Sequence, residues 1–183
     1  SKPFGGFGDG GALFTDDDEL AEKFRWIRVH GQARKQHHPV LGLNGRLDTI
    51  QAAALLATFE IFPEEIQQRQ AIAGRYDTPL STADASDITI PYVAEGSTSA
   101  YAQYTILSPQ RDAIQEDLKK VGIPAMPYYI LPLHLQPVFK NLGYQNGSYP
   151  VAEQVAAQCL SLPMSAYLSE EDQAFIDRAI EEQ

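Results

Sequence analysis

The sequence is poor in cysteine, in cationic residues and in long apolar runs. A single cysteine, Cys159, stands among 183 residues, so no internal disulfide can form; this agrees with a reducing compartment such as the cytoplasm. The chain has 14 Lys and Arg and 24 Asp and Glu. The resulting net charge of −10 argues against nucleic-acid binding, which needs clustered cations. No apolar run approaches membrane-spanning length and no basic-then-apolar signal opens the chain, so we expect no membrane association.

Candidate metal ligands are equally sparse. His37 and His38 are adjacent, so their side chains point in different directions, and no cysteine or carboxylate follows at a suitable spacing. His30 and His134 are interpreted as structural or loop residues, with more interest in His134 because it lies in an aromatic segment. Cys159, within Ala-Ala-Gln-Cys-Leu, is expected to be a small buried side chain rather than a nucleophile. The sequence therefore predicts no metal site.

Local patterns predict a short strand, a helix, a loop and a long helix in the first part of the chain. The ranges are 11–15 for the strand, about 16–29 for the helix, 31–46 for the loop and 48–76 for the long helix. Residues 15–18 offer an N-cap and first-turn acids for the first helix. Asp48 and Gln51 have the spacing of a capping box, in which two side chains satisfy the free N–H groups of a helix start. Pro63 is expected to kink or divide the long helix.

The composition changes after Tyr76 to a stretch rich in Ser, Thr, Asp and Ala, and we place a domain boundary between residues 77 and 78. Short strands and helices then alternate, which predicts a small α+β domain over residues 78–183. The expected strands are 88–90, 101–107 and 161–163, and the expected helices are 108–122, 150–160 and 169–182. Gly122 is expected to close the first of these helices, and Ser169 with Asp172 to cap the last. Residues 123–130 are expected to be extended and aromatic.

Lys2 opens a run of Pro, Phe and Gly residues that ends at Gly11. Glycine lets a backbone approach a ligand closely, and a desolvated lysine amine can form a Schiff base with a carbonyl. The residues alone favour an ordinary surface lysine in a loop. The glycines do not lie between a strand and a helix, so they do not form a dinucleotide fingerprint.

Several motifs, in order along the chain, resemble the DegT/DnrJ/EryC1/StrS family of sugar aminotransferases, which use pyridoxal phosphate (PLP). They are K-P-x-G-x-x-G-D-G-G-A-x-x-T at 2–15, D-D-x-x-L-A-E-K at 16–23, H-G-Q at 30–32, N-x-R-L-D-x-x-Q-A-A at 44–53, Y-A-Q-Y-T-I at 101–106 and P-L-H-L-Q-P at 132–137.

The resemblance implies an α/β fold: the C-terminal part of a fold-type I large domain (residues 1–77) followed by a small α+β domain (78–183). It also implies that Lys2 binds PLP and that the chain is the C-terminal half of a longer enzyme, inactive alone. The other half would supply the aspartate for the pyridine nitrogen and the ring that stacks on the cofactor.

The resemblance assigns further site residues. The residue matching Asn44 contacts the PLP phosphate of the partner in a homodimer, and the residue matching Arg46 lies near the sugar. Tyr128 and Tyr129 fall where the family places a substrate-pocket pair. From the residues alone, a solvated turn at 44–46 and aromatic packing at Tyr128 are equally good interpretations.

The implied reaction transfers an amino group from glutamate to a keto sugar nucleotide. The chain is most similar to enzymes acting on a UDP-linked 3-keto sugar, of the 2-acetamido-3-keto-glucuronate type, in bacterial surface-polysaccharide (lipopolysaccharide O-antigen) synthesis. Family members that dehydrate the sugar carry histidine in place of Lys2, so Lys2 favours transamination. Two alternatives stay open: a C4 aminotransferase for a dTDP- or UDP-linked 4-keto sugar, because Tyr128 stands where relatives carry histidine, and a non-catalytic regulatory protein that binds a sugar nucleotide.

Overall fold

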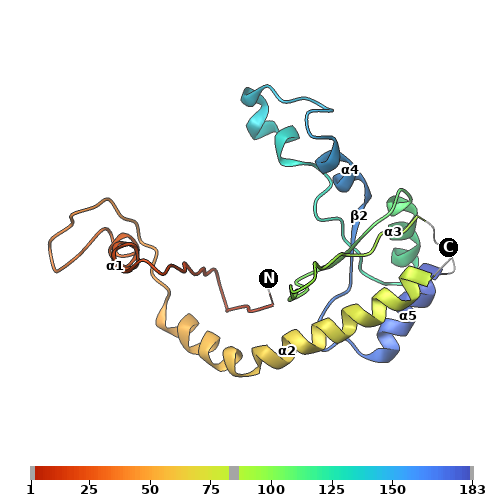
Figure 1. Cartoon of the computed structure of the whole chain (residues 1–183), viewed down its shortest axis with the longest axis horizontal. Coiled ribbons are helices and arrows are strands. Elements are labelled where there is room, and N and C mark those ends of the chain that lie inside the picture. The colour runs from red at the N-terminus through yellow and green to blue at the C-terminus, as the bar shows by residue number, and fades with distance from the viewer. Residues whose placement is uncertain (1–2, 83–86, 182–183) are drawn as a thin grey trace. The chain divides into compact units, whose positions relative to one another are not determined.

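The structure is a computed structural model that describes residues 3–82 and 87–181. The chain divides into two compact units, Ser1–Phe62 and Pro63–Gln183 (Figure 1). These units are not the large and small domains that the sequence predicts, whose boundary between residues 77 and 78 stays a prediction. Within the described ranges, no helix is long and apolar enough to cross a membrane.

The first unit contains helix α1, Asp18–Ile27, and the start of helix α2, Thr49–Thr82. Asp17 caps α1, because its Oδ1 accepts a hydrogen bond from the N–H of Leu20 at 3.0 Å. Asp18 and Glu19 in the first turn add favourable charge at the positive end of the helix dipole. The sequence prediction of this helix and its cap is confirmed.

Three predictions for this part of the chain are wrong. Residues 11–15 form no strand, and no described residue pairs with their backbone, so their N–H and C=O groups have no ladder to join. The long helix does not end at Tyr76, because α2 continues to Thr82. Pro63 and Pro79 both lie inside α2, so of the predicted kink or division at Pro63 the division does not occur. A proline removes one helical hydrogen bond, a penalty of about 3 kcal/mol that the rest of a helix of 34 residues can absorb. The capping box is absent because Gln51 bonds elsewhere, as described below.

The second unit has a two-stranded antiparallel sheet of β1, Tyr104–Leu107, and β2, Cys159–Leu162. Tyr104 pairs with Leu162, and Ile106 pairs with Leu160. The α-helices are α3, Arg111–Lys120, α4, Pro150–Gln158, and α5, Glu170–Glu181, and the 3₁₀ helices are η1, Leu133–Leu135, and η2, Pro137–Leu142. This mixture of helix and sheet agrees with the predicted fold class.

The core of the second unit forms where the sheet meets the C-terminal part of α2. Tyr76, Tyr104 and Leu160 are fully buried there. The Tyr76 hydroxyl donates to the carbonyl of Pro163 at 2.9 Å, and the Tyr104 hydroxyl donates to Asp77 Oδ1 at 2.6 Å. Both phenols are therefore buried with their polar atoms satisfied, as a stable core requires.

The observed ends of helices and strands in the second unit agree only in part with the ends that the sequence predicts. The predicted cap at the last helix is confirmed, because Ser169 Oγ accepts from the N–H of Asp172 at 3.0 Å. The predicted strand 88–90 is reduced to a single bridge between Thr89 and Leu107, and strand 101–107 is shortened to β1. The predicted helix 150–160 ends at Gln158 because Cys159 already pairs with β1. Cys159 itself is buried, as expected.

Candidate functional site

The segment that follows the predicted cofactor lysine lies on helix α2. Lys2 itself is outside the described residues, and the description begins at Pro3. The ring of Phe4 packs against the rings of Phe59 and Phe62, with centroid distances of 5.7 and 4.9 Å. The N–H of Phe7 donates to Oε1 of Gln51 at 2.7 Å. Two separate contacts therefore attach this segment to the helix.

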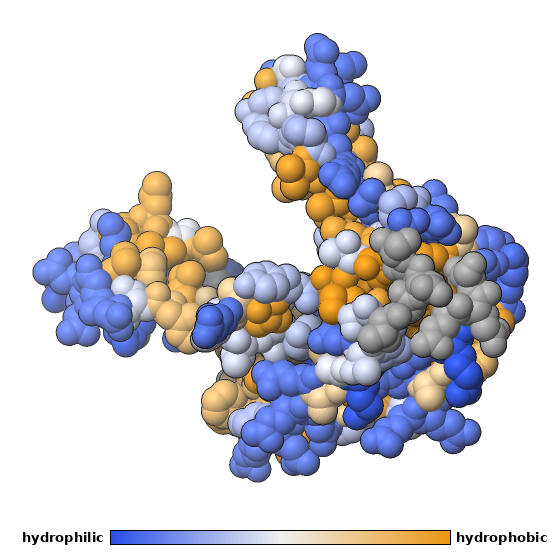
Figure 2. Space-filling model, turned by 45° about the vertical axis from the view of Figure 1, so that its right-hand side comes forward, coloured by the Kyte–Doolittle hydropathy of each residue, from blue (hydrophilic) through white to orange (hydrophobic). Residues whose placement is uncertain are grey.

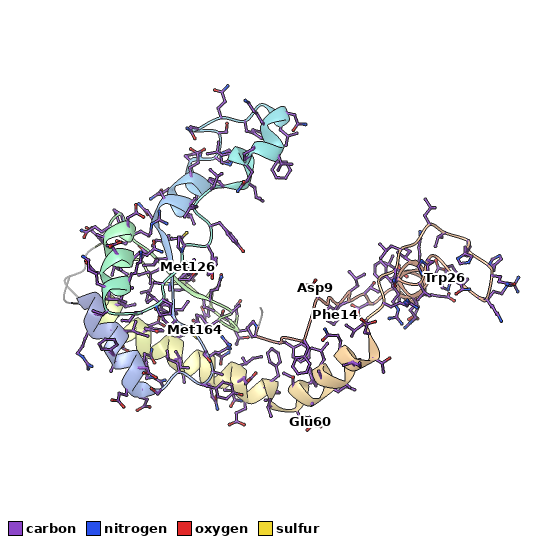
Figure 3. All side chains as sticks on the ribbon, turned by 180° about the vertical axis from the view of Figure 1, so that it is seen from behind. Asp9, Phe14, Trp26, Glu60, Met126 and Met164 are labelled. Carbon is purple, nitrogen blue, oxygen red and sulfur yellow. The ribbon has the colours of Figure 1, made fainter. Side chains whose placement is uncertain are left out.

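Two glycines are needed for the close approach to Gln51. A Cβ added at Gly6 would lie 2.8 Å from Gln51 Oε1, and one added at Gly8 would overlap Gln51 Nε2. Figure 3 shows Asp9 and Phe14 further along this segment, on one side of α2, and Glu60 on the opposite side of the helix. The glycine-rich sequence is thus explained by backbone packed against a helix side chain rather than by a strand.

Asn44 and Arg46 form a second group, at the end of the loop after α1. Arg46 Nε donates to Asn44 Oδ1 at 2.9 Å, and both residues are exposed. The loop is closed by main-chain contacts, because Asn44 bridges to Val29 and Gly31, with φ of 73°, lies against the carbonyl of Val40. Within the part of the chain that is described, Arg46 forms no salt bridge with an acid.

This pair suits an anionic group. The Asn44 oxygen is occupied by Arg46, so the donors of this pair that remain for a ligand are the amide N–H groups and the outer guanidinium nitrogens. Donors of that kind bind phosphate oxygens, and guanidinium does so in a bidentate manner. The residues present therefore fit the phosphate of PLP or of a nucleotide.

Tyr128 and Tyr129 lie in the second unit, before η1, where they form a turn. The extended segment predicted for residues 123–130 therefore does not continue to its end. The two tyrosine rings pack edge to face at 5.5 Å, and the residues are 41% and 74% exposed. Tyr129 lines an open apolar pocket of about 830 Å³ together with Leu133, Phe139 and Tyr149. Figure 2 shows hydrophobic residues on the surface of this part of the second unit. Exposed tyrosines beside a pocket can stack on a sugar or a base.

His134 is a positioned structural residue, as the sequence suggests, and its partner Glu153 was not predicted. His134 Nε2 lies 2.9 Å from Glu153 Oε1, and the side chain of His134 is only 8% exposed. Glu153 also accepts from the N–H groups of Gly147 at 2.8 Å and Tyr149 at 3.2 Å. The Gly147 bond is the main cause that lowers the pKa of Glu153. A glutamate in the first turn after Pro150 is the sequence signal that could have identified it.

The described residues thus place the predicted site residues in two groups, one in each unit. Asn44 and Arg46 are together in the first, and Tyr128 and Tyr129 are together in the second. Gln51, which the sequence suggested as a capping residue, instead belongs to the anchor of the segment after Lys2. No group of three or more His, Cys, Asp or Glu able to hold a metal ion occurs among the residues that the structure covers.

The chain belongs to the DegT/DnrJ/EryC1/StrS aminotransferase family, whose sequence profile matches residues 1–181. It is 47% identical over 182 residues to the "pleiotropic regulatory protein" of Geobacillus stearothermophilus, covering 100% of this chain and 49% of that protein. It is 45% identical over 168 residues to the UDP-2-acetamido-2-deoxy-3-oxo-D-glucuronate aminotransferase of Pseudomonas aeruginosa, covering 92% of this chain and 45% of that enzyme. The chain therefore spans about half the length of these relatives.

Solved structures agree with this assignment. The chain resembles a DegT/DnrJ/EryC1/StrS aminotransferase from Brucella abortus at a TM-score of 0.89 and 42% identity, covering 97% of this chain and 47% of that one. It resembles DesV of S. venezuelae at a TM-score of 0.94 and 33% identity, covering 98% and 48%. A putative sugar aminotransferase from Streptococcus pneumoniae in its PMP form is similar at a TM-score of 0.80 and 25% identity, covering 92% and 44%. The fold is thus that of part of this class of transferase.

Proposed function

We propose that the full-length protein is a PLP-dependent aminotransferase that moves an amino group from glutamate to a keto sugar nucleotide. The observation that carries the proposal is a lysine at position 2, followed by a segment packed onto α2, in a chain of this aminotransferase family. We propose a UDP-linked 3-keto sugar as the acceptor and bacterial surface-polysaccharide synthesis as the setting, in the cytoplasm. The relatives from P. aeruginosa and Acidithiobacillus ferrooxidans, named as aminotransferases of 3-oxo UDP sugars, support that choice.

PLP, when bound, supplies an electron sink for the carbon that loses its proton. In the proposal, the Lys2 amine holds the cofactor, and Lys2 Nζ then carries the proton between donor and acceptor positions. Asn44 binds the cofactor phosphate of the partner subunit in a homodimer, and Arg46 binds the anionic substrate. Because the chain carries a net charge of −10, local donors such as Arg46 must hold the substrate's phosphates.

Tyr128 and Tyr129 are the residues of the second unit that we propose to contact the substrate. Each can stack on the sugar and donate one hydrogen bond, but neither can become cationic as histidine can. The exposed position of Tyr129 at the rim of an apolar pocket supports this role.

A regulatory protein that binds a sugar nucleotide without catalysis is the second candidate. It is favoured by the 47% identity to a protein named as a pleiotropic regulator. The two candidates differ at Lys2, because only the aminotransferase needs its amine.

The test is borohydride reduction of the full-length protein after incubation with PLP, followed by mapping of the pyridoxyl label. The expected label is on Lys2, and Lys2→Ala should abolish both the label and amine transfer from glutamate. Lys23→Ala, an exposed lysine of α1, is the control and should retain both. A label on another residue, or none, would refute the proposal. A panel of UDP-3-keto, UDP-4-keto and dTDP-4-keto sugars then identifies the acceptor.

Mixed dimers test the proposed role of Asn44. Lys2→Ala and Asn44→Ala proteins are each expected to be nearly inactive alone. If Asn44 acts across the dimer, each mixed dimer has one intact site, and random mixing gives about a quarter of wild-type activity. No recovery on mixing would place Asn44 in the site of its own subunit or outside the site.

A further inference from the structure

Gln51 stands where the first turn of α2 meets the glycine-rich segment. Its Oε1 receives the Phe7 N–H at 2.7 Å from a residue 44 positions earlier in the chain. Its side chain is half-buried, and the backbone at Gly6 and Gly8 passes so close that a Cβ at either position would contact it. A side chain packed this tightly on both sides has little freedom to leave the segment.

Phe4 provides a second contact on the same helix. Its ring is held between Phe59 and Phe62, about two and a half turns further along α2. The backbone between Phe4 and Phe7 is therefore fixed at both ends.

We propose that Gln51 is a positioning residue for the Lys2 amine. By accepting the Phe7 N–H, Gln51 holds the segment that follows Lys2 in the sequence on α2, and we expect this to favour attachment of the cofactor to the Lys2 amine. This inference rests on the proposed function, since it assumes that Lys2 binds PLP. It adds a residue that acts through the backbone and touches neither cofactor nor substrate.

The chemistry of the side chain defines the variants. Gln51→Leu keeps the approximate volume and removes the acceptor, whereas Gln51→Glu keeps an acceptor oxygen at the same reach. Gln67→Leu is the matched control, because Gln67 is exposed on the same helix. All variants are made in the full-length protein.

The first measurement is hydrogen exchange at the Phe7 amide in the cofactor-free protein. We expect exchange to be roughly 2- to 10-fold faster in Gln51→Leu, near wild type in Gln51→Glu and unchanged in Gln67→Leu. The second measurement is the rate at which PLP becomes attached to Lys2, trapped by borohydride at timed intervals. This rate should be about 10-fold lower in Gln51→Leu and largely restored in Gln51→Glu. In Gln51→Leu, the decrease in kcat should be larger than the change in KM for glutamate.

Two results would overturn the proposal: unchanged Phe7 exchange in Gln51→Leu, or faster exchange with an unchanged rate of attachment. Either leaves the proposed function intact as long as wild-type protein is labelled at Lys2. If wild-type protein is not labelled, it is the proposed function that fails.

A second pair of variants keeps the test valid if Gln51→Leu does not fold. Gly6→Ala should slow attachment, because its Cβ would lie 2.8 Å from Gln51 Oε1. The same change made in a Gln51→Ala background should have little further effect, because the obstructing atom is gone. Equal effects in both backgrounds would show that Gln51 and the segment are not coupled, and would also overturn the proposal.

Discussion

Replacing Tyr104 with phenylalanine tests the polar contact at the centre of the second unit. The ring is fully buried, and its hydroxyl donates to Asp77 Oδ1 at 2.6 Å. A hydrogen bond to a charged group contributes about 1.5–3 kcal/mol. Asp77 is half-buried and keeps some access to water, so we expect Tyr104→Phe to lower the free energy of unfolding by about 2 kcal/mol.

Hydrogen exchange of the β1 amides in the full-length protein measures this loss directly. At about 1.4 kcal/mol for each factor of ten, exchange should become about 30-fold faster in Tyr104→Phe. Tyr92→Phe is the matched control, because Tyr92 is 88% exposed and should change exchange by less than a factor of about two. If the two variants behave alike, the hydroxyl of Tyr104 contributes nothing and the reasoning is wrong.

Three further predictions follow from buried or hydrogen-bonded groups. Leu160→Ala should lower the free energy of unfolding by about 2–5 kcal/mol, measured by the same exchange, because Leu160 is fully buried between the strands and the helices. Burial raises the pKa of Tyr76 and of Tyr104 above the ordinary value of 10.0, so the folded state holds both phenolic protons more tightly than the unfolded state. These two groups should therefore leave the free energy of unfolding unchanged below pH 10 and lower it as the pH rises above 10. The fall should be less steep when either tyrosine is replaced by phenylalanine. Hydrogen bonding lowers the pKa of Glu153 below 4.5, so the stability that its carboxylate adds should be lost as the pH falls through that lower pKa. Hydrogen exchange in the loop before α4 should therefore become faster in acid, and Glu153→Gln should remove this acid dependence.

Each of these has a result that would contradict it. Leu41 is 97% exposed, so Leu41→Ala should leave the free energy of unfolding nearly unchanged. If Leu160→Ala changes it equally little, burial of Leu160 does not stabilise the second unit. A flat alkaline profile in wild type would show that the phenols ionise equally in both states. An acid profile in Glu153→Gln identical to wild type would assign the acid sensitivity to other carboxylates.

The sequence predicted the features that depend on a few neighbouring residues. A residue within 15–18 and Ser169 were expected to cap helices, because a cap needs only the next three residues. The observed caps are Asp17 and Ser169. Gly122 was expected to close α3, and it follows the last turn with φ of 79°.

The features that were missed depend on partners far away in the chain. Gln51 has the spacing of a capping residue, yet a backbone N–H 44 residues earlier takes its oxygen. Cys159 continues the helical pattern of α4, yet pairing with Leu107 makes it the first residue of a strand. Residues 11–15 have the composition of a strand, but composition cannot supply the neighbouring strand that a ladder needs. In the candidate site, the resemblance to the aminotransferase family pointed to Lys2, Asn44 and Arg46, while the contact that holds the segment after Lys2 could be seen only in three dimensions.

The burial of Cys159 makes the chain convenient for attaching reporter groups. Cys159 is 1% exposed and its thiol faces backbone carbonyls, so alkylating reagents should reach it slowly while the protein is folded. A cysteine introduced at Phe7, where the native side chain is 88% exposed, would then be the reactive thiol of this chain. The emission of a fluorophore coupled there would change if the glycine-rich segment moves when PLP is added.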